Sequence, residues 1–293
     1  MGSVGSSFIA VIFAGFLGVV DFAAGAPAAE QAPKLKLTAP EIVAKNVAAR
    51  GGLEAWRKIQ TMAWAGHMES PNSPMPDMRF VLEQERPNKT CFEVTTMSRK
   101  TVRVFDGAHG WKLRAGHDGR PELQPFTPEE TRFAHAAQAV DTPLMDYERK
   151  GNMVTLDGVE EIEGHKAYRL NVRLASGEPQ KVWIDAKTFL DIRYDRMSYD
   201  VSGKPGFVSV YSRDYRSIEG LQIPSALEIG VGSGTGKAPD RMVIERVALN
   251  PPFDDRTFAK PTPARGRDPA SRGLGGTPQM NPSLERNPTP EMK

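Results

Sequence analysis

The stretch TAPEIVAKNVAARGGLEAWRKIQTMAWAGHM, from Thr38 to Met68, contains the change from helix to sheet on which the predicted fold depends. It opens with Thr38 and Glu41 in the S/T-x-x-E pattern of a capping box, in which the two residues satisfy free backbone amides at a helix start. Apolar residues at helical spacing follow, and Gly51-Gly52 ends the helix because glycine accepts the positive φ of a helix end. From Thr61 the apolar period falls to two, which is typical of a strand. The stretch therefore predicts an amphipathic helix that leads directly into the first strand of a sheet.

Beyond this stretch, apolar residues continue to alternate with a period of two. The segments that read as strands next are residues 78–84, 90–96, 101–105 and 110–113. Residues 127–140 open with Thr, Pro and two Glu, which is typical of a helix start. From Val154 to Leu249, six or so further strand segments lie between closely spaced turns that contain glycine. The pattern predicts one large antiparallel sheet, interrupted by a helix.

The charges of the chain are nearly balanced, with 38 basic against 36 acidic residues and a net charge of +2. A dedicated nucleic-acid-binding protein usually has a strong basic excess, so we expect no nucleic-acid partner. Cys91 is the only cysteine, which excludes an internal disulfide and a CxxC metal or redox pair.

Motifs of common catalytic sites do not occur. The sequence contains neither the GxSxG elbow of hydrolases nor the HExxH helix of zinc enzymes. Residues 232–237, GSGTGK, differ from a phosphate-binding loop because Val231 and Ala238 stand where its first glycine and its Ser or Thr should be. A flexible hairpin is the preferred interpretation. We expect no catalytic residue, no cofactor and no enzyme activity.

One group of side chains was considered as a metal site. Asp106, His109 and His117 are close in sequence and are of the types that bind transition metals. They lie in segments rich in turns and lack the i, i+4 spacing of a helix-borne pair. We therefore expect no metal site.

The N-terminal segment resembles a targeting signal in its composition. Residues Phe8 to Val20 form an apolar run that is too short to span a bilayer comfortably, and small residues in the A-x-A pattern follow it. No Lys or Arg precedes the run, so the positive n-region of a signal peptide is missing. We expect a signal peptide over residues 1–28; a buried N-terminal segment of a cytosolic protein is the alternative.

The C-terminal residues 262–293 have a different composition from the rest. They are rich in Pro, Gly, Arg and Asn and contain few large apolar side chains. Burial of so few apolar groups would not offset the entropy of ordering the segment. We expect a disordered tail.

Six short motifs lie between Thr38 and Pro261. In chain order they are ARGGLEAWRKIQTM from Ala49, ERPNK from Glu85, FDGAHGWKL from Phe105, VWIDAKTFLDIR from Val182, IEGLQIPS from Ile218 and NPPFDDRTFAKP from Asn250. Together they resemble envelope proteins related to the outer-membrane lipoprotein-sorting carriers, the LolA/LolB-like family. The resemblance implies an α+β, mainly β fold: a large curved antiparallel sheet forms an incomplete β-barrel, and helices cap its concave face. It also implies a LolA-like lipid- or lipoprotein-binding domain over residues 29–261 and a periplasmic location.

One face of the predicted sheet is rich in methionine and aromatic side chains, which adapt to flexible partners such as acyl chains. The alternative is that these side chains form an ordinary core beneath the helices. Alternation along the first strand places Ala63 and Ala65 on the opposite face. The resemblance implies that the apolar face lines a ligand-binding cavity. The candidate binding residues are Met62, Trp64, Met68, Phe80, Leu82, Phe92 and Trp111.

The function implied by the resemblance is that of a carrier that shields acyl chains, in outer-membrane lipoprotein sorting or envelope lipid transport. Its partners would be the acyl chains of lipids or lipoproteins, an envelope protein and, transiently, a membrane. Two alternatives stay open: a regulatory module that senses envelope stress with the same fold, and a hydrolase with an unrecognised site.

Overall fold

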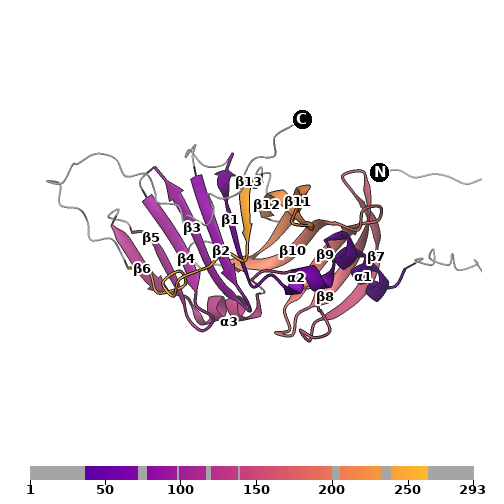
Figure 1. Ribbon diagram of the computed structural model, residues 1–293, viewed down its shortest axis with the longest axis horizontal. Helices are drawn as coiled ribbons and strands as arrows, with labels where there is room; N and C mark the ends of the chain where they lie inside the picture. Colours follow the sequence, from indigo (N-terminus) through magenta and orange to yellow (C-terminus); the bar gives the residue numbers. More distant parts are fainter. Residues whose placement is uncertain are drawn as a thin grey trace, which may run out of the picture. The chain divides into compact units, whose positions relative to one another are not determined.

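The described part of the chain contains three α-helices and thirteen strands (Figure 1). The computed structural model describes residues 37–71, 78–97, 99–116, 120–137, 139–199, 205–231 and 239–262, all of which belong to the unit Leu35–Lys293. The helices are α1 (Ala39–Ala49), α2 (Leu53–Arg57) and α3 (Pro128–Ala136). The strands are β1 (Thr61–Glu69), β2 (Met78–Glu85), β3 (Lys89–Thr96), β4 (Arg99–Phe105), β5 (Gly110–Ala115), β6 (Pro121–Pro125), β7 (Met153–Ile162), β8 (His165–Arg173), β9 (Pro179–Asp185), β10 (Asp191–Tyr199), β11 (Pro205–Ile218), β12 (Leu221–Val231) and β13 (Asp240–Leu249).

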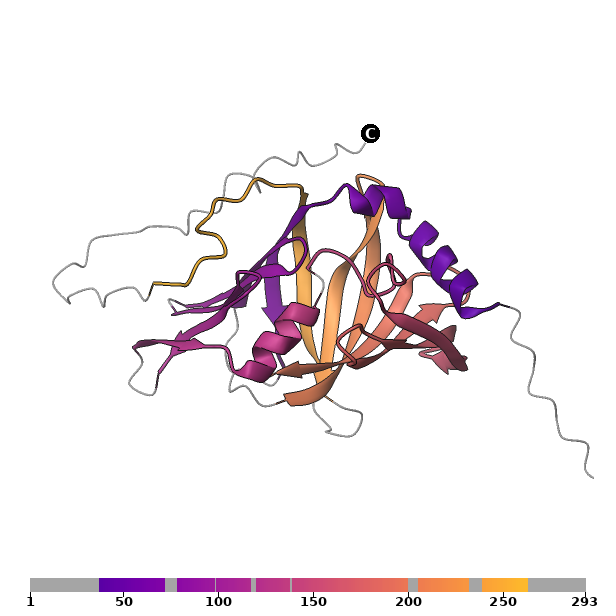
Figure 2. The ribbon, with the colours of Figure 1, turned by 90° about the horizontal axis from the view of Figure 1, so that it is seen from below.

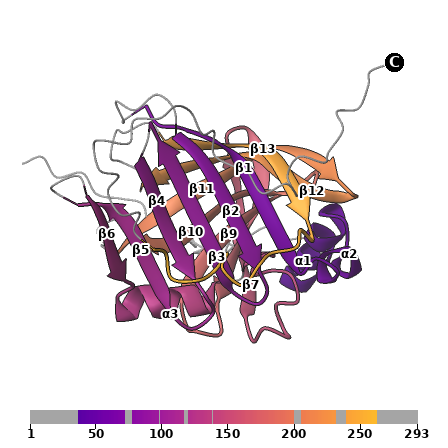
Figure 3. The ribbon, with the colours of Figure 1, turned by 60° about the vertical axis from the view of Figure 1, so that its left-hand side comes forward.

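These strands form one open sheet in the order β6-β5-β4-β3-β2-β1-β13-β12-β11-β10-β9-β8-β7. Strands that follow one another in the chain are hydrogen-bonded neighbours, except at the centre of the sheet, where β1 pairs with β13 in antiparallel register. Figure 1 shows the two halves, β1–β6 and β7–β13, side by side, and Figure 3 shows the sheet with the first half in front of the second. The predicted large antiparallel sheet is confirmed, and it is not closed, because β6 and β7 are its two edges.

The helices lie on the concave face of the sheet, as Figure 2 shows for α3. Helix α1 packs Ile42 and Val43 against residues of β8 and β9, and α2 packs Trp56 against β1, β12 and β13. The segment after α3 adds Val140 and Met145 to the same apolar layer. The prediction that helices cap the concave face is confirmed.

The segment after β13 covers part of the opposite face. Phe258 packs there with Val102 and Leu113, and its ring contacts that of Phe253 edge to face at 5.5 Å. Ala63 and Ala65 lie on this face, as strand alternation predicts, and both are buried next to Phe253. Both faces of the sheet therefore carry a packed apolar layer in this region.

The residues around Thr38 and Arg50 explain where α1 begins and ends. The Glu41 carboxylate accepts hydrogen bonds from the Thr38 backbone amide at 2.8 Å and from the Thr38 hydroxyl at 2.7 Å, so the expected capping box is present. At the other end, Gly51 has φ +110°, and a Cβ there would lie 2.6 Å from the carbonyl oxygen of Gly220. Only glycine suits this position, which lets the chain turn sharply into α2.

Three elements differ from the sequence prediction. Helix α3 ends at Ala136 instead of Val140, because Ala137 has an extended backbone. Strand β6 was not predicted: Pro121 and Pro125 bound it, and proline is uncommon within strands except at sheet edges, where β6 lies. Strand β7, the first of the second half, starts at Met153, one residue before the predicted Val154, and forms the other edge of the sheet.

Some predicted segments cannot be compared with the structure. Residues 1–28, the GSGTGK segment at 232–237 and the tail from residue 263 onward lie outside the described residues. Among the residues that are described, no helix is both long enough and apolar enough to cross a membrane.

Candidate functional site

A cavity of about 450 Å³ lies on the concave side of the sheet, bounded by α3 and the segment that follows it. Its walls come from both halves of the sheet: β1 to β4 on one side and β9 to β12 on the other. The volume falls within the range of about 300–1,000 Å³ that is typical of small-molecule sites. The central ladder between β1 and β13 holds the two walls in one continuous sheet.

The lining of this cavity is mainly apolar. Aromatic and aliphatic side chains of the sheet form one part of it, and small side chains of α3 and the next residues form another. The larger apolar residues are Trp56, Trp64, Leu82, Phe92, Phe126, Phe133, Leu144, Leu174, Val182 and Leu227, and the alanines are Ala134, Ala136, Ala137 and Ala139. Because alanine leaves room where a larger side chain would fill the space, these four positions help keep the cavity open.

Two buried side chains of opposite charge are part of the cavity lining. Arg50, which follows α1, pairs with Asp191 at the start of β10, and both side chains are less than one-tenth exposed, at 8% and 6%. The amide of Asn46 donates to the same carboxylate at 3.1 Å, and the Arg50 guanidinium lies 5.1 Å from the Trp56 ring. The two charges balance each other. Because Arg50 and Asn46 both bind the carboxylate of Asp191 on β10, these contacts fix α1 to the second half of the sheet.

Tyr215 on β11 is the neighbour of this pair. Its hydroxyl donates to the carbonyl oxygen of Asp191 at 3.2 Å. Burial, together with the nearby Asp191 carboxylate, raises the pKa of Tyr215 well above its ordinary value. The phenol therefore stays neutral at any physiological pH.

A second charged cluster lies under the first turn of α3. The Glu130 side chain is 1% exposed and accepts hydrogen bonds from Arg103 at 3.0 Å, from Lys112 at 3.1 Å and from the Thr127 backbone amide at 2.9 Å. Burial alone would raise the pKa of Glu130, but the hydrogen bonds from Thr127, Lys112 and Arg103 outweigh it and hold the pKa below its ordinary value. Glu130 is therefore a carboxylate at neutral pH.

A third charged group holds the segment after α3 in place. Asp141 accepts from Arg86 at 2.5 Å and also pairs with Lys150. Arg86 in turn donates to the carbonyl oxygen of Ile59 at 2.7 Å. This network joins the cavity wall formed by residues 139–144 to the segment between α2 and β1.

The predicted binding residues have three different positions. Trp64, Leu82 and Phe92 line the cavity. Met62, Met68 and Phe80 belong to the apolar cluster of the same face, and Met62 and Phe80 are fully buried within it. Met62 and Phe80 are therefore parts of the core, and the half-buried Met68 packs against it.

Trp111 is on the opposite face, so the predicted face of this residue is wrong. It packs in the cluster that contains Val102, Val104 and Phe258. The reason is the register of the β4–β5 hairpin, in which Val104 is opposite Trp111. Residues directly opposite each other share a face, and the loop length between two strands determines which residues these are.

The charged residues of the cavity were not predicted. Arg50 and Asp191 look like ordinary surface residues in the sequence, because each is about 140 positions away from the other, which is its partner. Glu130 did have a local signal: Thr127 and Glu130 form a second S/T-x-x-E capping box, which predicts the helix start but not the two cations beneath it.

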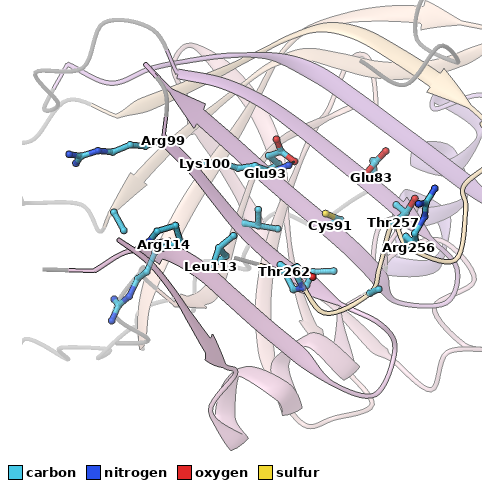
Figure 4. A pocket seen from close by; sticks show the side chains of 16 residues that line it. Glu83, Cys91, Glu93, Arg99, Lys100, Leu113, Arg114, Arg256, Thr257 and Thr262 are labelled. Atoms are coloured by element: carbon cyan, nitrogen blue, oxygen red, sulfur yellow. The ribbon is translucent and has the colours of Figure 1, made fainter. Parts of the chain in front are cut away.

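A second cavity, of about 520 Å³, lies on the opposite face between β3–β5 and residues 256–262 (Figure 4). Its floor includes Val102, Val104 and Leu113, and charged side chains such as Glu83 and Arg256 form its rim. Cys91 also lines it, and burial raises the pKa of this thiol to about 12. The thiol is therefore protonated and unreactive at neutral pH.

The described residues contain no group of three side chains placed to bind a metal ion. Asp106 and His109 approach each other to 3.7 Å. The third member considered above, His117, lies outside the described residues.

The structure thus combines an open antiparallel sheet with a mainly apolar cavity on its concave face, and apolar linings with a few polar groups are typical of small-molecule sites. Comparisons with known proteins give likenesses at low sequence identity. No protein-family model and no curated protein matches the chain.

Several solved structures are similar to it, among them the following three. A LolA superfamily protein from Nitrosomonas europaea is 15% identical, with 76% of this chain and 98% of that chain covered and a TM-score of 0.48. A putative outer membrane lipoprotein-sorting protein domain from Vibrio parahaemolyticus is 9% identical, with 76% and 96% covered and a TM-score of 0.48. A DUF1329 family protein from Desulfovibrio piger is 11% identical, with 75% and 97% covered and a TM-score of 0.47. The first two of these proteins are named for the lipoprotein-sorting family that the sequence motifs resemble.

Proposed function

We propose that this protein is a periplasmic carrier that binds lipids or lipoproteins and shields their acyl chains in the concave cavity. The observation that carries the proposal is the cavity itself, with Trp64, Leu82 and Phe92 on one wall and the alanines of α3 on another. Each methylene group removed from water contributes about 0.8 kcal/mol. Binding of this kind needs apolar surface and no catalytic group.

The proposed partners follow from this chemistry. A molecule with an acyl chain would come from a membrane or from a lipoprotein, so the protein would contact a membrane or an envelope protein transiently. The work of the carrier would be transport or lipoprotein sorting within the envelope, as the family resemblance implies.

The first prediction tests the cavity. Trp64→Glu places a carboxylate in the apolar lining, where an unpaired charge is strongly disfavoured. We expect the variant to bind the uncharged fluorescent probe N-phenyl-1-naphthylamine at least about tenfold more weakly than the wild type. Fluorescence titration measures the affinity, and circular dichroism checks that the variant is folded.

The matched control is Trp111→Glu, because Trp111 is also a partly buried tryptophan of the sheet but lies on the other face. Ala65 would be a poor control, since it is buried beside Phe253. If Trp64→Glu does not fold, Ala137→Trp serves instead, because its large side chain would fill the cavity. Unchanged probe binding by a folded cavity variant, or an equal loss in Trp111→Glu, contradicts the proposed site.

A second prediction tests the proposed location. If the predicted signal peptide is cleaved after Ala26 or Ala28, the mature protein begins at Pro27 or Ala29 and has a net charge of +3, because Asp21 is the only charged residue lost from a total of +2. Intact-mass measurement of protein from its native host reads the start directly. A full-length chain found in the cytosol would contradict the periplasmic assignment.

A further inference from the structure

The cluster beneath α3 has an excess of positive charge. Arg103 and Lys112 both donate to Glu130, so two cations share one carboxylate, and the sum of one negative and two positive charges is one positive charge. Within the described residues, neither cation forms an ion pair with a second carboxylate. A buried net charge favours a counter-ion, because the interior screens it less than water does.

One buried donor of this cluster lacks a partner within the part of the chain that the structure describes. Arg103 uses Nη2 for Glu130 and lies 4.8 Å from the Phe126 ring, while its buried Nη1 has no hydrogen-bond partner there. Leaving such a donor unsatisfied is unfavourable, because the group has lost its hydrogen bonds to water and gained none in return. Because Arg103 lines the cavity, a ligand oxygen would supply the missing acceptor.

A second arginine lines the cavity from the other half of the sheet. Arg196 on β10 lies 5.7 Å from the ring of Phe133, one turn further along α3 than Glu130. Among the described residues its side chain makes one long hydrogen bond, of 3.4 Å, to the Met197 carbonyl oxygen. None of the ion pairs among the described residues includes Arg196. Two cations from β4 and β10 therefore flank the same helix at the cavity lining.

The carboxylates that line the cavity oppose this excess only in part. Asp191 is paired with Arg50, and Asp141 is paired with two cations of its own. Glu178, before β9, is the other carboxylate of the lining and forms no ion pair among the described residues. None of the three is an ion-pair partner of Arg103 or Arg196 among the described residues, so the excess positive charge of the Glu130 cluster remains.

From this arrangement we propose that the ligand of the cavity carries an anionic headgroup, a carboxylate or a phosphate ester, that is bound between Arg103 and Arg196. The inference rests on the proposed function and adds the class and the orientation of the ligand. The headgroup oxygens accept from the free Nη1 of Arg103 and from the Arg196 guanidinium, and the acyl chain extends along Phe92, Leu82 and Trp64. Arginine suits this role because its planar donors match both carboxylate and phosphate.

The test compares three ligands with the same sixteen-carbon chain and different headgroups: hexadecanoate, hexadecyl phosphate and hexadecanol. Each displaces N-phenyl-1-naphthylamine below the concentration at which micelles form, at about pH 8, where both acids are ionised. We expect the wild type to bind at least one of the anions about tenfold more tightly than the alcohol. A stronger preference for hexadecanoate indicates a fatty-acid-like ligand, and a stronger preference for hexadecyl phosphate indicates a phospholipid-like ligand.

The variants assign the preference to the two arginines. Arg196→Gln should reduce the preference for the anion to about threefold or less while leaving the affinity for hexadecanol unchanged, and Arg196→Lys should retain most of it. Arg103→Gln should act in the same way, but it also removes a partner of the buried Glu130, so Arg196→Gln is the decisive variant if Arg103→Gln is unstable. The charge-matched control is Arg149→Gln, whose side chain is 78% exposed and does not line the cavity.

The outcomes separate the two proposals. Equal affinity for the three ligands, or an anion preference that Arg196→Gln does not change, overturns the headgroup inference and leaves the carrier function standing. Failure of all three ligands to displace the probe, or failure of the probe to bind, contradicts the proposed function and this inference with it.

Discussion

Replacing Asp191 with alanine should lower the free energy of unfolding by about 3–5 kcal/mol, because it leaves the Arg50 guanidinium buried without a counter-charge. Asn46 and Tyr215 would also lose their hydrogen bonds to the Asp191 carboxylate. Urea unfolding followed by tryptophan fluorescence measures the change, and the midpoint should shift while the slope stays the same.

The control for this variant is Asp195→Ala, on the same strand. Asp195 pairs with Arg193, but its side chain is 24% exposed and outside the cavity lining. Partly exposed pairs contribute about 0–1 kcal/mol, so this variant should be nearly as stable as the wild type. An equal loss in both variants would mean that the position of Asp191 in the buried pair has no special importance.

Glu130→Gln should have a similarly large effect, of about 3–5 kcal/mol near neutral pH, because it leaves Arg103 and Lys112 without their shared carboxylate. The effect should depend on pH. The folded-state pKa of Glu130 lies below the ordinary value of 4.5, so the carboxylate stabilises the fold fully above about pH 4.5, and this stabilisation is lost as the pH falls through the folded-state pKa.

The measurement is therefore a series of urea unfolding curves from neutral pH into the acid range for the wild type and Glu130→Gln. The difference between the two should be constant above about pH 5 and should shrink below about pH 4.5. Glu129→Gln is the control, because Glu129 precedes Glu130 directly in the chain but has an exposed side chain. A difference that does not shrink in acid would show that shape, and not charge, makes Glu130 important.

The elements that depend on local pattern were predictable from the sequence. The capping box at Thr38, the glycine end of α1 and the period-two strand that follows were all read from spacing within one stretch, and the structure contains each of them. Alternation also placed Trp64 on the concave face and Ala65 on the other. These features need only neighbouring residues to be decided.

The features that depend on distant partners were not predictable in the same way. The face of Trp111 was wrong because it follows from the register of a hairpin, which a strand pattern alone does not fix. The difference between Met62, which is core, and Trp64, which lines the cavity, depends on which helix residues stand above them. Buried charges such as Asp191 are identified only when the partner side chain, far away in the chain, is known.

The pairing of β1 with β13 has a consequence for how this chain folds. Met62 is opposite Leu249, so the ladder at the centre of the sheet joins residues separated by almost the whole described chain. Contacts of such high sequence separation form late, because a long loop must close before they contribute any stability, and high contact order is associated with slow folding. Until β13 has docked, β1 has an unpaired edge in the middle of what will be the sheet, which is the kind of edge that pairs with other chains. The period before this ladder forms is therefore when the protein is most prone to aggregation.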